Sequence, residues 1–305
     1  MSNHSELALI EWIRQRAPST PNLEVGIGDD CAVWQPTGAP LLFTTDVLME
    51  DVDFRVDETT PQLIGRKAMA VNLSDIAAMA GRPLAALVGV ALPKSRGFDF
   101  ARDLHAGMQS LAEEFNVAII GGDTNTWDGR LVISVTLIGE AIERGPVRRS
   151  GAKPGDWLFV TGPLGGSILG HHLTFTPRIR EALELHCLMD LHAMIDLSDG
   201  LAADLYHLLD ESHVGATLVA DAIPISEDAR RMSDVRSPLD HALSDGEDFE
   251  LLFAVSANDG RRLFAIADPG KTTYIGTIDA EPGCRIQRSN GRIEQLARGG
   301  WEHQF

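Results

Sequence analysis

The sequence predicts an α+β fold made of two αβ domains. The 305 residues exceed the usual size of one domain, and strand-type and helix-type patterns both cluster and alternate along the chain. A polar segment with one proline and two glycines, residues 149–156, separates two such runs. We therefore expect an N-terminal domain over residues 1–148 and a C-terminal αβ domain over residues 149–305.

The expected N-terminal domain combines helices with strands. In chain order, the patterns predict a helix over 5–16, strands over 31–34 and 41–46, a helix over 61–80, a strand over 85–92, a helix over 98–115, and strands over 117–120 and 131–139. The second helix has Thr60 as N-cap, Pro61 at its first position and Gly81 just past its end. Spacing by three and four residues places on one face of that helix Ala68, Asn72, Asp75 and Met79. Alternation predicts one buried strand face, formed by Leu131, Ile133, Val135 and Leu137.

The expected C-terminal domain begins with a strand over 157–161 and a glycine turn, GPLGG. The patterns that follow predict a helix over 178–191, a strand over 194–197, a helix over 199–211, and strands over 216–220, 251–255 and 274–278.

Charge and cysteine content exclude several classes of protein. The formal net charge is −18 and no basic stripe is visible, so nucleic acid is not an expected partner. No apolar run approaches the ~20 residues of a membrane span, and the first residues lack the layout of a signal peptide. Cys31, Cys187 and Cys284 are far apart and form no CxxC pair. This argues against a thiolate zinc site and fits a reducing cytoplasm.

Acidic motifs recur beside strand and helix patterns. They are GIGDDCAV (26–33), TTD (44–46), NLSD (72–75), GGDT (121–124), DLSDG (196–200) and SDGEDFE (244–250). Carboxylates that converge repel one another unless a cation neutralises them. Mg²⁺ prefers oxygen ligands and is commonly held by one or two carboxylates together with substrate phosphates. One such motif alone is more often a turn or a helix cap, but six in one chain predict a Mg²⁺ site.

Two other patterns have weaker functional interpretations. Ala265, Gly270, Lys271 and Thr272 fit a loosened phosphate-loop motif, but that loop must follow a strand and open a helix. Here the pattern runs helix, turn, strand, so we do not expect a phosphate loop. The adjacent His171 and His172 have no metal-ligand partner at a suitable spacing, and we expect them to be polar surface residues.

Motifs from residue 26 to residue 253 together resemble the thiamine-monophosphate kinase family. They are GIGDDCAV, TTD, GRKAMAVNLSDIAAMAG, GGDT, RSGAKPGDWLFVTG, AMIDLSDGLAADL and GEDFELLF, and the final GGWEHQF resembles the aromatic ending of that family. The resemblance covers nearly the whole chain. It extends more weakly to a wider superfamily that includes aminoimidazole-ribonucleotide synthetase, selenophosphate synthetase and a hydrogenase-maturation protein.

The resemblance implies a fold, a homodimer and a set of site residues. The N-terminal domain would form a β-barrel shared across the dimer, and the C-terminal domain would be an α/β sandwich. Mg²⁺ contacts are implied at Asp30, Thr44, Thr45, Asp46, Asp75, Asp123, Asp196 and Asp199. ATP contacts are implied at Gly122, Asp123, Arg149 and Ser198. The residues implied in catalysis are Asp46, Asp75, Asp123 and Arg149. Those implied in substrate contact are Asp53, Glu247 and Trp301.

The chain departs from the family pattern at three places. Asp53 stands where the family commonly has a substrate-contacting histidine, and Asp245 stands where a second glycine is usual. The stretch before Pro177 is shortened. These departures concern substrate contacts more than metal and ATP contacts.

The activity implied is transfer of the γ-phosphoryl group of ATP to the phosphate of thiamine monophosphate. The second pKa of a phosphate monoester is near ~6, so the acceptor oxygen is largely deprotonated at neutral pH and needs no strong general base. Positioning and electrostatics must then supply the catalysis. Two alternatives stay open: a related ATP-dependent synthetase or kinase for another phosphorylated metabolite, and a nucleotide- or cation-binding protein without turnover.

Overall fold

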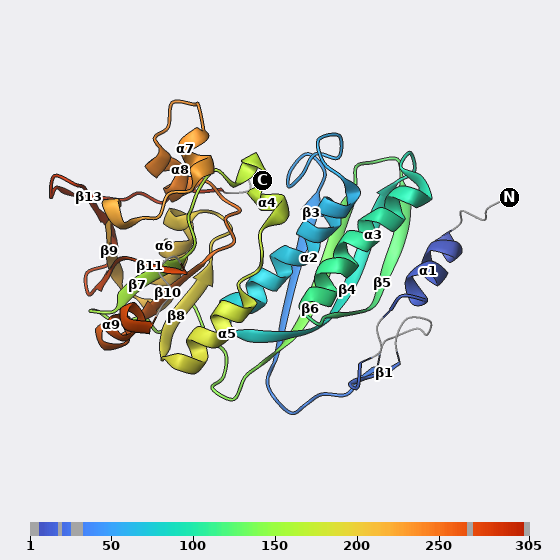
Figure 1. Ribbon diagram of the computed structural model, residues 1–305, viewed down its shortest axis with the longest axis horizontal. Coiled ribbons are helices and arrows are strands. Elements are labelled where there is room, and N and C mark those ends of the chain that lie inside the picture. The colour runs from blue at the N-terminus through green and yellow to red at the C-terminus, as the bar shows by residue number, and fades with distance from the viewer. Residues whose placement is uncertain (1–5, 18–19, 26–32, 267–270, 302–305) are drawn as a thin grey trace. The chain divides into compact units, whose positions relative to one another are not determined.

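The computed structural model describes residues 6–17, 20–25, 33–266 and 271–301 (Figure 1). The chain forms two compact units. Unit 1 comprises Met1–Ile76 and Gly81–Glu143, and unit 2 comprises Ala77–Ala80 and Arg144–Phe305. The functional boundary at residue 148 stays a prediction. Among the described residues, none of the helices has the length and apolar character that a membrane crossing requires.

Unit 1 is built on an open sheet. In its described part the strand order is β3 (Leu41–Met49), β6 (Val132–Ala141), β4 (Gly81–Pro93) and β5 (Ala118–Trp127). β4 and β5 are parallel, and the other two pairings are antiparallel. The fully buried side chains include Leu131, Ile133, Val135 and Leu137, which confirms the predicted strand face. β3 and β5 form the edges of this sheet, so the described part of one chain contains no closed barrel.

The helices α2 (Pro61–Ala78) and α3 (Gly97–Glu114) run side by side across one face of this sheet (Figure 1). Their backbones touch at two glycines. A Cβ atom on Gly65 would lie 2.0 Å from the carbonyl oxygen of Leu104, and a Cβ atom on Gly107 would lie equally close to the α2 backbone. Only glycine permits this close approach of the two helices.

Two smaller elements precede the sheet of unit 1. Helix α1 (Glu6–Arg14) packs on α3 through the ring of Trp12, which meets His105 edge-on at a centroid distance of 5.7 Å. Strands β1 (Leu23–Val25) and β2 (Val33–Trp34) form an antiparallel pair. The predicted helix over 5–16 is thus confirmed, and the strand predicted over 31–34 is found in its last two residues.

Unit 2 is built on a second, mostly antiparallel sheet. Its described strands are β7 (Trp157–Thr161), β8 (Leu191–Asp196), β9 (Gly215–Val219), β10 (Leu251–Val255), β11 (Thr272–Asp279), β12 (Gly283–Gln287) and β13 (Ile293–Gln295). Their order is β13-β12-β9-β11-β7-β10-β8. Among these pairings, β9 with β12 is parallel and the others are antiparallel. The mixed α/β character expected from the sequence is confirmed for both units.

The described helices of unit 2 are α4 (His171–Thr174), α5 (Ile179–Leu188), α6 (Leu201–Ser212), α7 (Glu227–Arg231), α8 (Pro238–Ser244) and α9 (Ala257–Ile266). The prediction of a helix over 178–191 was too long, because β8 already begins at Leu191. Helix α9 precedes β11, so the order helix then strand around the loosened phosphate-loop pattern is confirmed. Residues 267–270 of that pattern lie outside the described residues.

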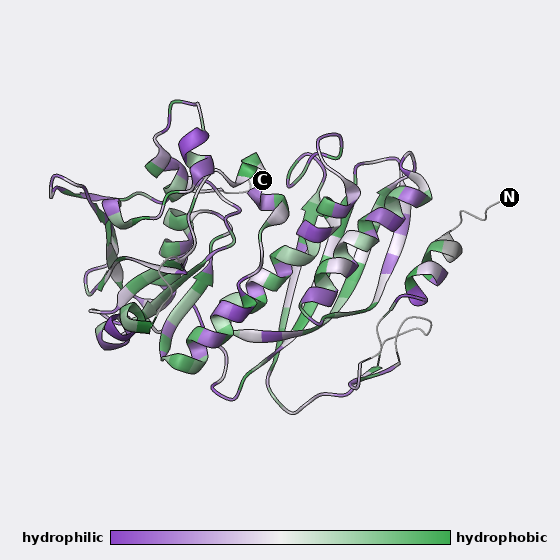
Figure 2. Ribbon diagram, viewed as in Figure 1, coloured by the Kyte–Doolittle hydropathy of each residue, from purple (hydrophilic) through white to green (hydrophobic). Residues whose placement is uncertain are grey.

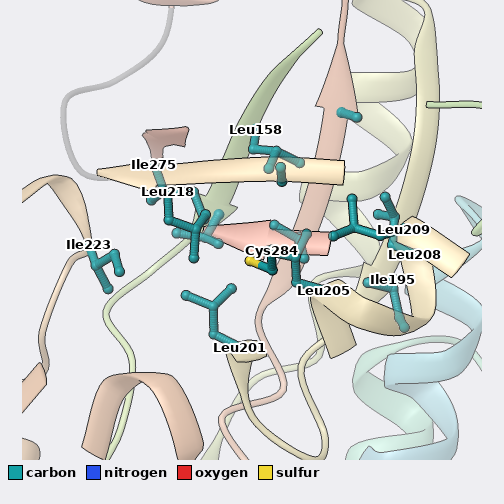
Figure 3. Packing of buried hydrophobic residues seen from close by; sticks show 14 of the residues in the cluster. Leu158, Ile195, Leu201, Leu205, Leu208, Leu209, Leu218, Ile223, Ile275 and Cys284 are labelled. Carbon is teal, nitrogen blue, oxygen red and sulfur yellow. The ribbon is translucent and has the colours of Figure 1, made fainter. Parts of the chain in front are cut away.

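Strands β7, β10 and β8 of the unit 2 sheet are buried on both faces. Leu158, Leu205 and Ile275 belong to the cluster in Figure 3, in which α6 covers one face. On the other face the rings of Phe159 and Phe253 are stacked, with centroids 5.6 Å apart. Figure 2 accordingly shows strongly hydrophobic colour along these strands, whereas the visible side of α3 in unit 1 carries hydrophilic turns.

Candidate active site

Strand β3 divides its residues between two faces by alternation. The helix-covered face receives Leu42, Thr44, Asp46 and Leu48, and the more exposed face receives Phe43, Thr45, Val47 and Met49. The Thr44 hydroxyl donates a hydrogen bond to the carboxylate of Asp75 on α2. The Thr45 hydroxyl instead accepts from Thr136 on the opposite face. The structure therefore brings Thr44 and Asp75 together, places Asp46 on their face, and places Thr45 on the other.

Asn72 lies one helical turn before Asp75 and was not predicted as a site residue. Its side chain is fully buried, and its amide nitrogen donates to the carbonyl oxygen of Ala68 at 3.2 Å. Its Oδ1 atom has no hydrogen-bond partner among the described residues. Leaving a buried acceptor unsatisfied costs about 1–3 kcal/mol. This oxygen is therefore a candidate ligand for a cation, and its place in the NLSD motif was the signal that pointed to it.

Gly122 and Asp123 lie within β5 rather than after its end, so the strand predicted over 117–120 was too short. A Cβ atom on Gly122 would lie 1.9 Å from the carbonyl oxygen of Val88, which requires glycine at this position. β5 and β3 are opposite edges of the sheet. Three strand spacings separate them, so Asp123 lies on the order of 14 Å from Asp46 of the same chain, across two intervening strands.

The candidate ligands of unit 1 match the chemistry of Mg²⁺. Thr44, Asp46, Asp75 and the Oδ1 atom of Asn72 supply only oxygen, which is the donor type that Mg²⁺ prefers. Within the described ranges, no three His, Cys, Asp or Glu side chains gather into a metal site. Mg²⁺ needs only one or two carboxylates when phosphates complete its shell, so this donor set fits a Mg²⁺–phosphate group. Asp30 lies outside the described residues.

Asp53 closes the turn that follows β3. Its carboxylate accepts a hydrogen bond from the backbone N–H of Met49 at 2.7 Å, and its carbonyl oxygen accepts one from Nζ of Lys67 at 2.6 Å. Lys67 is only 1% exposed. Asp53 is thus a half-buried structural residue of the turn rather than a solvated acid, and its predicted contact with substrate stays a prediction.

The DLSDG motif of unit 2 forms the loop between β8 and α6. Asp196 is buried at the end of β8, and Ser198 and Asp199 follow it in the loop. The carboxylate of Asp204 accepts hydrogen bonds from the backbone N–H groups of Asp199 and Gly200 at 3.0 and 3.1 Å. These two hydrogen bonds hold the backbone of the loop in place at the start of α6.

Asp204 was not singled out in the sequence. Burial raises its pKa to about 8, with a further contribution from the carboxylates of Asp196 and Asp199. Its signal was an aspartate at the fourth position of a helix, where it can reach back to the preceding loop. Asp204 is therefore a buried carboxyl group that anchors the backbone of the loop carrying Asp199.

Glu247 and Trp301 both meet the DLSDG loop. The backbone N–H of Glu247 donates to the carbonyl oxygen of Ser198 at 2.7 Å, and that of Trp301 donates to the carbonyl oxygen of Asp199 at 3.0 Å. Gly300 lies against the same loop, because a Cβ atom there would be 2.4 Å from the Asp199 oxygen. The structure therefore gathers the two predicted substrate residues of unit 2 around Ser198 and Asp199.

Glu247 has an unusual backbone and a buried partner. Its φ is +66°, a conformation that costs a non-glycine residue about 1–3 kcal/mol. Its Oε2 atom lies 3.2 Å from Nδ1 of His172. The expectation that His172 is a polar surface residue was wrong, since it is only 6% exposed. This contact could not be predicted from local sequence patterns, because 75 positions separate the two residues.

Two further carboxylates hold the glycine turn after β7. The backbone N–H of Gly165 donates to both oxygens of Asp248, and that of Gly166 donates to Asp245, all at 2.9 Å. Burial raises the pKa of Asp248 to about 7. Asp245 also contacts Nδ1 of His241 at 2.9 Å. The unusual Asp245 thus binds the glycine turn and His241.

Arg149 lies in the exposed segment before β7. Its carbonyl oxygen accepts a hydrogen bond from the Ser212 hydroxyl at the end of α6, 3.0 Å away. The N–H groups of Gly151 and Ala152 donate to the same hydroxyl oxygen. The backbone of this segment is therefore fixed, while the guanidinium group stays accessible to a phosphate.

Comparison with known proteins identifies the family. The domain families described as AIR synthase related protein match the chain twice, the N-terminal domain over residues 28–141 and the C-terminal domain over residues 161–289. The thiamine-monophosphate kinase of Rhodopirellula baltica is 40% identical over 98% of this chain and 97% of its own length. The chain belongs to the thiamine-monophosphate kinase family.

Solved structures agree with this family assignment. A crystal structure of thiamine-monophosphate kinase from Stenotrophomonas maltophilia has 35% identity and a TM-score of 0.81, over 92% of this chain and 96% of that one. A structure described as AaThiL complexed with AMPPCP and TMP has 29% identity and a TM-score of 0.77, over 100% of this chain and 98% of that one. Members of the family thus share the whole fold described above.

Proposed function

We propose that this chain is an ATP-dependent kinase that converts thiamine monophosphate to thiamine diphosphate. The observation that carries the proposal is the relationship to thiamine-monophosphate kinases, which extends over 98% of the chain. A relative of the same fold was solved with AMPPCP, an analogue of ATP, together with TMP. The residues around the two acidic regions suit this chemistry.

The residues of unit 1 would hold the metal and the phosphates. Asp46, Asp75 and Asp123, with Thr44, would hold Mg²⁺. The contacts with Mg²⁺ predicted for Asp30, for Thr45 on the other face of β3, and for Asp196 and Asp199 of unit 2 stay predictions. When bound, Mg²⁺ neutralises phosphate charge so that one anion can approach another. The backbone at Gly122 and Ser198 and the guanidinium of Arg149 would position ATP, Arg149 through paired hydrogen bonds to phosphate oxygens. Alignment in line with the γ-phosphoryl group is the main catalytic contribution.

The residues of unit 2 would recognise the thiamine part. Thiamine carries a cationic thiazolium ring and a flat aminopyrimidine. Glu247 offers a partly exposed carboxylate, and Trp301 offers an indole ring that is 59% exposed. Both groups attract a cationic aromatic ring. Asp53 is the weakest candidate for substrate contact, because its carboxylate already closes the β3 turn.

We further propose a homodimer in which the sheets of two copies close into a barrel. The sheet face opposite the helices exposes Phe43 by 68%, Val47 by 56%, Met49 by 44% and Leu87 by 38%. Contiguous apolar side chains of this size on a soluble domain mark an interaction surface. A second copy would cover this face and pair the free edges of β3 and β5, which removes both exposed edges.

The dimer would also complete the acidic site. Asp46 and Asp123 of one chain lie on opposite edges of the sheet. If β3 of one protomer pairs with β5 of the other, Asp46 comes next to the strand that carries the partner's Asp123. This arrangement accounts for two acidic motifs that one chain keeps apart.

The proposed function is tested by product analysis. Purified protein is incubated with ATP and Mg²⁺, with and without thiamine monophosphate, and ADP and thiamine diphosphate are quantified. We expect ADP and thiamine diphosphate in equal amounts and little ADP without the acceptor. ADP release that does not depend on thiamine monophosphate, or formation of no thiamine diphosphate, contradicts the proposal.

A cytoplasmic location is also proposed, in keeping with the free thiols of Cys187 and Cys284.

A further inference from the structure

Two contacts join the short helix α4 to the segment 247–249. Nδ1 of His172 lies 3.2 Å from Oε2 of Glu247. The ring of Phe175, directly after the helix, stacks on Phe249 with centroids 4.2 Å apart and an angle of 15° between the planes. The segment that carries Glu247 is therefore held against α4 at two alternate positions.

The backbone of this segment explains why alternate side chains point toward α4. Glu247 and Phe249 both have positive φ, +66° and +51°. The residues between and after them turn the other way: Asp248 accepts from the Gly165 N–H, and Glu250 accepts from the Arg178 guanidinium. Asp248 and Glu250 are each only 2% exposed. The course of the backbone is thus fixed by contacts that do not involve His172, and the contact of His172 is with the side chain of Glu247.

The burial of the two partners is unequal. His172 is 6% exposed, whereas the Glu247 side chain is 29% exposed. A buried and therefore immobile group holds one that faces solvent. Restricting a flexible carboxylate to one rotamer before the ligand arrives removes part of the entropy cost of binding.

We propose that His172 is a positioning residue for Glu247, and that through it the chain recognises the cationic, hydrogen-bond-donating part of thiamine monophosphate. The proposal rests on the proposed function, because that function makes Glu247 a substrate contact. His172 itself does not touch the substrate. Its loss weakens binding of thiamine monophosphate and leaves ATP binding and the chemical step unchanged.

The test compares substitutions at His172 in the full-length protein. For His172→Ala we expect the KM for thiamine monophosphate to rise about tenfold, with kcat and the KM for ATP within about twofold of the unmodified chain. His172→Asn places an N–H group near the position of Nδ1 and should restore most of the affinity. His172→Gln places its amide near the position of Nε2 and should behave like alanine.

A matched control separates positioning from general damage. His186 is another buried histidine of unit 2, 5% exposed, whose ring contacts the carbonyl oxygen of Gly145 at 2.9 Å. His186→Ala should lower Tm by as much as His172→Ala or more, with no change in the KM for thiamine monophosphate. A second control is His172→Ala made in a Glu247→Ala background, where no acceptor is left for the histidine and it should cause no further rise in KM.

Each outcome either supports or contradicts the positioning role of His172. A KM within twofold of the unmodified chain in His172→Ala, equal behaviour of the Asn and Gln variants, or an equal rise in the Glu247→Ala background overturns the proposal. If the unmodified chain makes no thiamine diphosphate, the proposed function fails instead. Calorimetric titration of thiamine monophosphate without ATP then still decides whether His172 and Glu247 act together on binding: an affinity that neither substitution changes refutes the inference as well.

Discussion

The backbone N–H of Trp301 donates a hydrogen bond to the carbonyl oxygen of Asp199, 3.0 Å away. The last described residue of the chain is therefore tied to the acidic loop between β8 and α6. The side chain of Trp301 is 59% exposed. Trp301 thus lies beside the acidic loop, with more than half of its side chain at the surface.

Replacing Trp301 by alanine should weaken substrate binding without unfolding the protein. A cation–π or stacking contact contributes roughly 0.5–2 kcal/mol, so we expect the KM for thiamine monophosphate to rise about fivefold. Tm and the KM for ATP should hardly change, because the exposed ring buries little area. Steady-state kinetics and thermal unfolding measure these effects, with Trp301→Phe as the conservative control. If both variants bind substrate like the unmodified chain, Trp301 has no role in the site.

The exposed face of the unit 1 sheet should control assembly. Phe43→Glu places a charge within the apolar face, and its burial in a dimer would cost several kcal/mol. Light scattering at micromolar concentration should therefore show a dimer for the unmodified chain and a 33.0 kDa species for the variant. The exposed Phe264 of α9 in unit 2 provides the control, and Phe264→Glu should stay dimeric. A monomeric unmodified chain would refute the shared barrel.

Complementation tests whether each acidic site takes residues from both chains. Asp46→Asn and Asp123→Asn should each be inactive alone. If Asp46 acts with the partner's Asp123, a mixed dimer contains one intact site, and equimolar mixing after subunit exchange should restore about a quarter of the activity. If both residues serve a site within one chain, the mixture stays inactive. Gel filtration of the mixture confirms that the dimer has formed.

The raised pKa of Asp248 predicts how stability changes with pH. Its carboxyl group is protonated up to about pH 7 in the folded protein but only up to about pH 4 in the unfolded chain. Between these values the folded state holds the extra proton, so this residue's contribution to stability is full below pH 4 and is lost as pH rises through 7. Asp248→Asn, compared with the unmodified chain, should therefore show a Tm difference that becomes more favourable to the variant from pH 5 to pH 8. Thermal unfolding in buffers containing EDTA measures this difference, and a constant difference contradicts the assignment.

Local patterns were sufficient for much of the fold. The alternation of Ile133, Val135 and Leu137 identified a strand with one buried face, and Pro61 marked the start of the helix that carries Asp75. The predicted end of that helix was too late, because α2 ends at Ala78, Ala80 takes the left-handed φ of +50°, and Gly81 already begins β4. Where the patterns predicted the end of a strand wrongly, pairing with the neighbouring strand determined where the strand ends. β5 continues through Gly122 and Asp123 because it stays paired with β4, past one register shift, as far as Trp127. Local sequence patterns instead predict that the strand ends at the two glycines.

The sequence predicted which motifs belong to the candidate site, but not which of their residues lie together in space. The sequence indicated acidic residues beside strands and helices, and the structure joins Thr44 to Asp75 and Ser198 to Glu247. It could not indicate His172, whose partner is distant in the chain and whose neighbours gave no helical or strand pattern. Nor could it show that Asp46 and Asp123 occupy opposite edges, because strand order depends on pairing between remote segments.

The alternation along β3 restricts how this part of the protein can change during evolution. One set of its residues carries Thr44 and Asp46, and the other carries Phe43 and Val47. Inserting or deleting a single residue in the strand would exchange the two faces. Thr44 and Asp46 would then point away from the helices, and the apolar side chains would point toward them. Substitutions can be tolerated one at a time here, but changes of length cannot. Insertions and deletions within the family should therefore avoid β3 and collect in loops such as residues 232–237.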